Sequence, residues 1–168
     1  MQQSMSSNRT QFERLVAEYL DDLQRYALWL CKNPALAADL VQETFLRAWK
    51  AHDKLRDQKA AKSWLITILR REYARTFERK VPDLTDIDDV MVADDTELEP
   101  HDQTEVNLLR RAMADLDPKY REPIVLQVVG GFSCDEIASI LGITRSAVMT
   151  QLFRARQKLK DALVDQPD

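Results

Sequence analysis

The chemistry that this sequence offers most clearly is the binding of phosphate groups. Five basic residues and no acidic residue lie between positions 145 and 160, which is enough to attract a nucleic-acid backbone without any reading of bases. These residues are Arg145, Arg154, Arg156, Lys158 and Lys160. The whole chain carries a formal net charge of −4, so this positive charge is a local feature.

The basic residues lie in a segment with the pattern of a helix-turn-helix. Ser133 and Glu136 have the spacing of a capping box, which predicts that a helix begins near Ser133. We expect this helix to bury Ile137, Ala138 and Leu141. Gly142 provides the backbone freedom to end it, and Thr144 can cap the next helix.

The second helix of this pair should bury one side and expose the other. An apolar stripe at helical spacing is formed by Val148, Leu152, Ala155 and Leu159. The opposite side carries Ser146, Met149, Thr150, Phe153, Arg154 and Gln157. This arrangement favours a DNA-binding helix-turn-helix, and an ordinary two-helix corner with a solvated basic face is the alternative.

A second basic segment lies earlier in the chain. Seven basic residues and two acidic ones fall between positions 59 and 80. In the expected helix SWLITILRREYARTFERK, we expect Trp64, Leu65 and Ile68 to pack inward. Four arginines then alternate with two aromatic residues, namely Arg70, Arg71, Arg75 and Arg79 with Tyr73 and Phe77. This combination suits unpaired bases and phosphates, although a charged surface helix whose aromatics complete a core would look the same.

The two basic segments are separated by a strongly acidic one. Residues 81–107 contain ten acidic residues and no lysine or arginine, with Pro82 and Pro100 among them. Such a stretch repels itself and has little apolar surface to bury, so we expect a flexible linker. The fold class that follows is all-α, with two small helical domains joined by this acidic linker.

The first domain should contain two further helices. A helical stripe of apolar residues runs from Arg9 to Leu30, and Asn33 followed by Pro34 predicts the start of the next helix. That helix should bury Ala37, Leu40, Val41, Thr44 and Ala48. Its other side carries Asp39, Gln42, Glu43, Leu46 and Lys50, with Trp49 at the margin. A leucine in a polar face is consistent with a protein contact, and equally with a single exposed leucine.

Several functional classes are disfavoured by the sequence. The only histidines are His52 and His101, and neither has a nucleophile or an orienting partner visible in the sequence, so we expect no enzyme. Cys31 and Cys134 lie far apart without metal-ligand spacing, and we expect partly buried thiols, no metal and no cofactor. No apolar run approaches the roughly 20 residues of a membrane span, and no signal peptide is visible, so we expect a cytosolic protein without membrane insertion.

Taken together, these motifs resemble those of an RNA polymerase sigma factor. The resemblance rests on DLVQETFLRAW at residues 39–49, SWLITILRREYARTFERK after it, the acidic segment, and EIASILGITRSAVMTQLFRARQKL near the end. It is strongest to the small, two-domain extracytoplasmic-function class. It implies a domain at residues 1–80 that binds polymerase and melts the minus-ten element. A linker at 81–107 and a domain at 108–168 that reads the minus-thirty-five element would follow.

The resemblance also implies a role for individual residues. Contacts to the clamp helices of the largest polymerase subunit would come from Asp39, Gln42, Glu43, Leu46 and Arg47. The minus-ten DNA would be bound by Arg70, Arg71, Tyr73, Arg75, Phe77 and Arg79, with a flipped base held by the loop at residues 52–58. The minus-thirty-five DNA would be bound by Arg145, Ser146, Met149, Thr150, Phe153, Arg154, Arg156 and Lys158.

The implied partners are therefore core RNA polymerase, promoter DNA and an anti-sigma factor that wraps both domains. Family members often carry basic residues where this chain has Met149 and Gln151, and Asn and Asp where it has Arg71 and Arg75, which leaves the promoter sequence open. Two other functions would account for only part of these features. A decoy that binds only an anti-sigma factor would not need two basic helices, and a simple repressor would not need the first domain.

Overall fold

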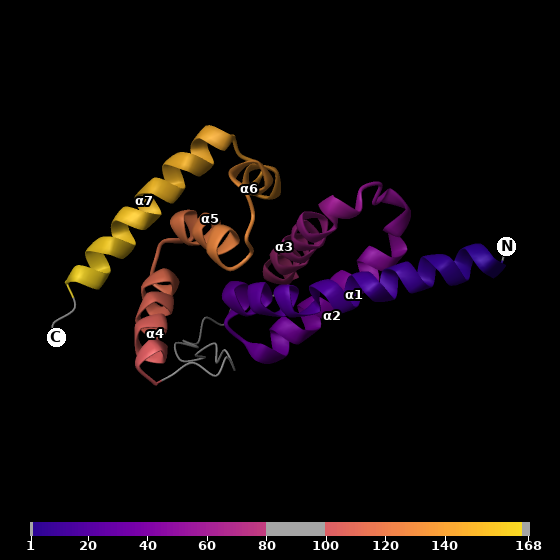
Figure 1. Cartoon of the computed structure of the whole chain (residues 1–168), viewed down its shortest axis with the longest axis horizontal. Helices are drawn as coiled ribbons and strands as arrows, with labels where there is room; N and C mark the ends of the chain where they lie inside the picture. The colour runs from indigo at the N-terminus through magenta and orange to yellow at the C-terminus, as the bar shows by residue number, and fades with distance from the viewer. Residues whose placement is uncertain (1, 80–99, 166–168) are drawn as a thin grey trace. The chain divides into compact units, whose positions relative to one another are not determined.

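The computed structural model describes residues 2–79 and 100–165, with side chains described for residues 5–76 and 105–165. Every regular element in these ranges is a helix, which confirms the predicted all-α class (Figure 1). The chain divides into two compact units, one containing α1–α3 and the other α4–α7. No helix in these ranges combines the length and apolarity that crossing a membrane requires.

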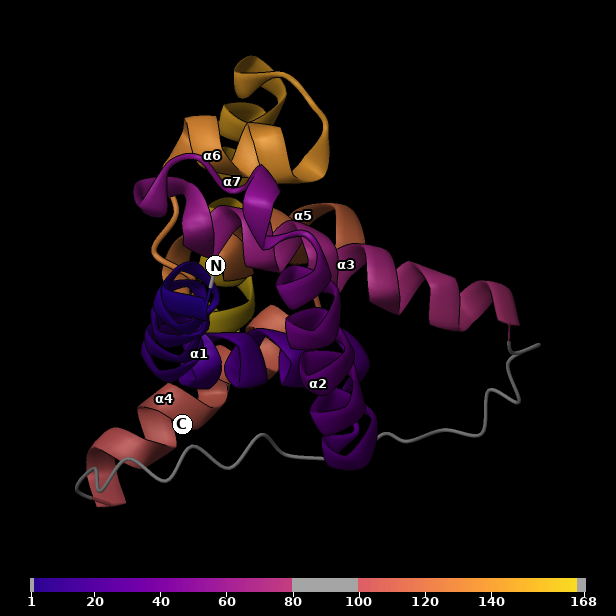
Figure 2. The ribbon, with the colours of Figure 1, turned by 90° about the vertical axis from the view of Figure 1, so that its right-hand side faces the viewer.

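The first unit is a bundle of three helices, α1 (Gln2–Cys31), α2 (Pro34–Lys50) and α3 (Ala61–Arg79), each in contact with the other two (Figure 2). Helix α1 begins before the predicted Arg9, because an apolar stripe marks only the part of a helix that packs. Asn33 caps α2 as predicted, since its side-chain oxygen accepts hydrogen bonds from the backbone N–H groups of Ala35 and Leu36. Short 3₁₀ turns, η1 (His52–Lys54) and η2 (Gln58–Ala60), connect α2 to α3.

The buried residues of α2 match the prediction, whereas those of α3 differ from it. Ala37, Leu40, Val41, Thr44 and Ala48 of α2 are all buried. In α3 the buried apolar residues are Ala61, Leu65, Ile66 and Leu69, while Trp64 and Ile68 are only partly buried. The buried side of α3 is therefore rotated from the predicted stripe, away from Trp64 and Ile68.

The second unit contains α4 (Pro100–Ala114), α5 (Pro118–Val128), α6 (Cys134–Leu141) and α7 (Arg145–Val164). Helix α7 packs against all three others. Residues 100–107, which we assigned to the linker, form the first half of α4, because a proline at the first helical position costs no hydrogen bond. The rest of the predicted linker, residues 81–99, lies outside the described residues, so its flexibility stays a prediction.

The helix-turn-helix of α6 and α7 forms as the sequence predicts. Ser133 and Glu136 make both hydrogen bonds of the capping box, at 3.2 and 3.1 Å. Gly142 ends α6 in the left-handed conformation with φ of 68°, and the Thr144 hydroxyl accepts from the N–H of Ala147. The register within α6 differs: Ile137 and Ile140 are buried, whereas Ala138 and Leu141 are only partly so.

The turn between α5 and α6 depends on a close approach at Gly130. A Cβ atom there would lie 2.6 Å from the main-chain oxygen of Leu126 and 2.7 Å from the Phe132 ring. We expect Gly130→Ala to destabilise the second unit by about 1–3 kcal/mol, because backbone cannot move aside as a side chain can. Urea unfolding followed by far-UV circular dichroism would measure this.

Two controls make the experiment specific. All three tryptophans, Trp29, Trp49 and Trp64, belong to the first unit, so tryptophan fluorescence should report an unchanged transition. Ser139→Ala, on the exposed side of α6, should change stability little. An unfolding midpoint for Gly130→Ala equal to that of the Ser139→Ala variant would show that the close approach is not restrictive.

Candidate nucleic-acid and polymerase interface

Helix α7 exposes all of the residues that we predicted to bind duplex DNA. Its buried residues are Val148, Leu152, Ala155 and Leu159, as the apolar stripe predicts. The eight predicted DNA-binding residues are all exposed: Arg145, Ser146, Met149, Thr150, Phe153, Arg154, Arg156 and Lys158. Met149 and Phe153 are 54% and 63% exposed, and a methionine and a phenylalanine so exposed on one helix favour a binding surface over a solvated one.

The two ends of α7 differ in how their charged side chains are held. Near the start, the Arg145 Nε lies 3.6 Å from an Asp135 carboxylate oxygen, in an exposed pair that contributes little to stability. Further along, Arg156 donates a hydrogen bond to the side-chain oxygen of Gln127 in α5. The Lys158 ammonium lies 5.4 Å from the centre of the Tyr120 ring, also in α5. Arg156 and Lys158 are therefore positioned by α5.

Helix α2 presents a polar face with one exposed leucine. Asp39, Gln42 and Leu46 are exposed, and the Leu46 side chain is 52% accessible. Glu43 and Arg47 are partly exposed, and Arg47 Nε lies 3.2 Å from Glu43 Oε1. The exposure of Leu46 confirms that it is not part of the core.

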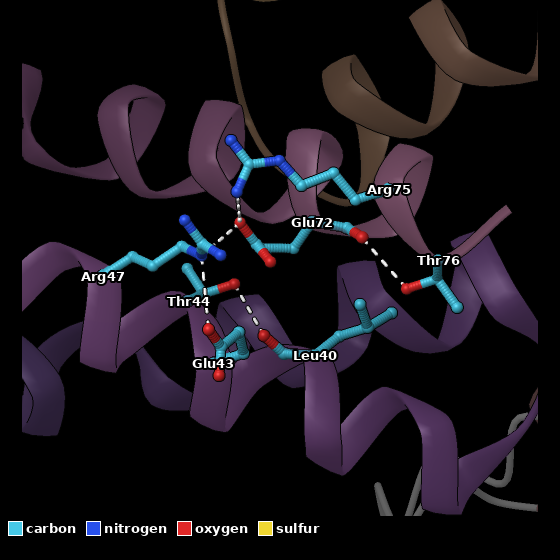
Figure 3. A network of polar contacts seen from close by, with 7 residues as sticks. All are labelled: Leu40, Glu43, Thr44, Arg47, Glu72, Arg75 and Thr76. Carbon is cyan, nitrogen blue, oxygen red and sulfur yellow. Dashed lines mark hydrogen bonds and ion pairs between the residues drawn. The ribbon is translucent and has the colours of Figure 1, made fainter. Parts of the chain in front are cut away.

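The predicted DNA face of α3 is described in part. Arg71 and Arg75 are exposed, while Arg70 and Tyr73 are partly buried and have partners of their own. The side chains of Phe77 and Arg79 lie outside the described residues. Glu72, to which no sequence motif assigned a role, is buried between α2 and α3 and lies within 4 Å of Arg47 and Arg75 (Figure 3).

An aromatic cluster lies where α2 meets the loop at residues 52–58. The Trp49 and His52 rings are stacked with centroids 4.9 Å apart, and Phe12 meets Trp49 edge-on at 5.1 Å. His52 Nδ1 donates to the main-chain oxygen of Trp49 at 2.6 Å, which fixes the imidazole in place. A cavity of about 220 Å³ beside it is lined by residues of α1, the loop and α3, including His52, Asp53, Leu55 and Gln58.

The two cysteines are partly buried free thiols, as expected. Cys31 Sγ donates a hydrogen bond to the main-chain oxygen of Asn33 at 3.3 Å. Burial raises the pKa of the Cys31 thiol, so it stays protonated at neutral pH. This geometry is that of a structural thiol.

Comparison with known families and proteins decides the identity of the chain. The sigma-70 region 2 family model matches residues 15–90, and the sigma-70 region 4 family model matches residues 107–159. The extracytoplasmic-function (ECF) RNA polymerase sigma factor SigM of Bacillus subtilis is 31% identical over 145 residues, covering 84% of this chain and 88% of that protein. The chain belongs to the ECF sigma factors. Proteins of this family are not catalysts; they direct RNA polymerase to specific promoters for initiation.

Further relatives support the same assignment. The ECF sigma factor SigL of Mycobacterium tuberculosis is 32% identical, with 87% of this ECF sigma factor and 85% of SigL covered. The sigma factor RpoE of Bartonella quintana, solved in complex with the anti-sigma factor NepR, aligns with a TM-score of 0.73 and 27% identity over 94% of this chain and 99% of that one. CnrH, solved with the cytosolic domain of CnrY, aligns with a TM-score of 0.68 and 28% identity over 98% and 95% of the two chains.

Proposed function

We propose that three separate surfaces of this sigma factor perform the steps of promoter recognition. The exposed face of α2, centred on Leu46, binds the clamp helices of the largest polymerase subunit. The basic face of α3 binds the melted minus-ten strand, and α7 reads the minus-thirty-five element as duplex. The observation that carries this proposal is the exposure of all eight predicted DNA-binding residues of α7, none of which belongs to its buried stripe.

The aromatic cluster at Trp49 and His52 supports a role in strand opening. Extruding one base from a duplex costs a few kcal/mol, which a binding pocket has to offset. Stacking on an aromatic side chain is worth about 1–3 kcal/mol for each base. The cavity beside the stacked rings is lined by the loop at residues 52–58, the segment expected to hold the flipped base. Binding energy rather than nucleotide hydrolysis would then drive melting.

We further propose that an anti-sigma factor controls this protein. The support is that the sigma factor RpoE, which aligns with the chain over nearly its whole length, was solved with the anti-sigma factor NepR. Binding of such a partner over the α2 or α7 surface would exclude polymerase or DNA. The action of the protein would take place in the cytoplasm, where polymerase and promoter meet.

The orientation of α7 in the major groove predicts two kinds of defect. Arg145→Ala or Thr150→Ala should cost about 1–3 kcal/mol and relax the preference at particular base pairs, because residues early in the helix meet base edges. Arg156→Ala or Lys158→Ala should weaken binding to all sequences alike, because side chains positioned by α5 would hold phosphates. Each lost phosphate contact should also reduce the salt slope by about one unit.

Binding of holoenzyme to a series of promoter variants at several salt concentrations would separate the two classes. Arg9→Ala, in an exposed pair with Glu13 on α1, is a suitable control and should change neither property. The same uniform loss in all four α7 variants would overturn the proposed orientation of the helix.

A further inference from the structure

Glu72 is the only charged residue that is buried among those whose side chains the structure describes. It lies on α3, within the basic segment, and its side chain is 8% exposed. A buried carboxylate is costly unless counterions surround it, so its partners determine what it can do. None of the three proposed surfaces includes Glu72.

Two arginines meet at one oxygen of this carboxylate (Figure 3). Arg47 Nε of α2 lies 2.5 Å from Glu72 Oε1, and Arg75 Nη1 of α3 lies 3.2 Å from the same oxygen. Arg47 belongs to the face proposed to bind polymerase, and Arg75 to the face proposed to bind the melted strand. A single buried carboxylate therefore joins the two surfaces.

Two threonine hydroxyls near Glu72 bond to main-chain oxygens. The buried Thr44 hydroxyl donates to the main-chain oxygen of Leu40 at 2.6 Å in α2. The Thr76 hydroxyl donates to the main-chain oxygen of Glu72 at 3.0 Å in α3. Both hydroxyls thus donate within their own helices and not to the carboxylate, which Arg47 and Arg75 contact (Figure 3).

Glu72 contacts only part of each guanidinium group. A guanidinium has five N–H groups, and the contacts to Glu72 engage one nitrogen of each arginine. Both side chains remain partly exposed, at 39% for Arg47 and 47% for Arg75. Their remaining N–H groups can bind a carboxylate or phosphate of a partner, with less freedom lost on binding than for a mobile side chain.

We infer that Glu72 is a positioning residue that pre-orients Arg47 for polymerase and Arg75 for the melted DNA strand. This inference rests on the proposed roles of the two faces. Loss of the carboxylate would release Arg75 and would leave Arg47 with only its more exposed partner Glu43, so one substitution would weaken two separate functions. A residue that only stabilised the bundle would show no such link to particular arginines.

The direct test is Glu72→Gln, which keeps the size of the side chain and removes its charge. We expect core polymerase affinity and open-complex formation each to fall by roughly 2- to 10-fold, the effect of releasing one ordered side chain at each surface. Glu13→Gln, which removes a carboxylate from an exposed arginine pair of the same unit, should change neither. Unchanged values for both functions in Glu72→Gln would overturn the inference.

Double-mutant cycles distinguish positioning from a general effect on folding. Arg75→Ala should impair open-complex formation less in the Glu72→Gln background than in the native one, and Arg47→Ala should do the same for polymerase binding. Additive losses would overturn the positioning role of Glu72 and would leave the roles proposed for the two faces standing. If neither arginine substitution had an effect in the native background, the roles proposed for the two faces would fall instead.

Stability can be monitored through the tryptophans, which all lie in the first unit. Should Glu72→Gln fail to fold, Glu72→Asp provides the second variant, because it retains the charge and withdraws it from both arginines. The same cycles with Glu72→Asp should show the same non-additivity, and strict additivity would again count against positioning.

Discussion

Replacement of Leu46 by glutamate should lower the affinity for core RNA polymerase by at least about 30-fold while leaving the fold intact. Leu46 is 52% exposed on α2, among polar residues, so a charge there should cost little in the free protein. In the complex the same charge would be buried at the centre of the contact without a partner. Substitutions at such central positions commonly cost 2 kcal/mol or more, which corresponds to the stated loss.

Titration of labelled core polymerase with the purified variant would measure this loss directly. Val164→Glu is a matched control, because it places the same charge on another exposed apolar residue, at the end of α7. Helix content and tryptophan fluorescence should match those of the native protein in both variants. Native affinity in a folded Leu46→Glu protein would remove α2 from the polymerase interface.

The second large effect concerns strand opening. Arg71→Ala combined with Arg75→Ala should leave closed-complex formation unchanged and reduce open-complex formation by roughly 100-fold. Both residues are exposed on α3, and each hydrogen bond to a charged group contributes about 1.5–3 kcal/mol. The loss should be confined to the open state, because the strand that these residues bind is unpaired only after melting.

Permanganate reactivity of thymines in the minus-ten region would report the open state, and gel-shift binding on ice would report the closed one. Arg9→Ala removes an exposed arginine of the same unit and serves as the control. Normal thymine reactivity in the double variant would show that this face of α3 is structural.

Local signals in the sequence were sufficient to predict where α2, α6 and α7 begin and where α6 ends. The caps at Asn33, Ser133 and Thr144 act through side-chain oxygens within three residues of the groups they bond, so sequence spacing determines them. The buried stripes of α2 and α7 were also correct, because each helix buries one well-defined side. Helices α3 and α6 were less predictable, since the buried side depends on the angle at which each packs.

The candidate surfaces on α2 and α7 could be predicted from the sequence, because a residue outside the buried stripe of a helix is usually exposed. The role of Glu72 did not follow. Its partner Arg47 is 25 residues away in the sequence, on another helix. The two side chains meet only because α2 packs on α3. One signal was present: Glu72 is one of two acidic residues in a basic segment and lies three residues before Arg75, which places both on one helix face.

Promoter-directed transcription by core RNA polymerase with and without this chain tests the central claim most directly. Purified core and a fragmented genomic library from the source cell should give discrete run-off transcripts only when the protein is added. Their start sites should share sequence elements near positions minus ten and minus thirty-five. Transcripts that are unchanged by the native, folded protein would contradict its assignment as a promoter-specific initiation factor.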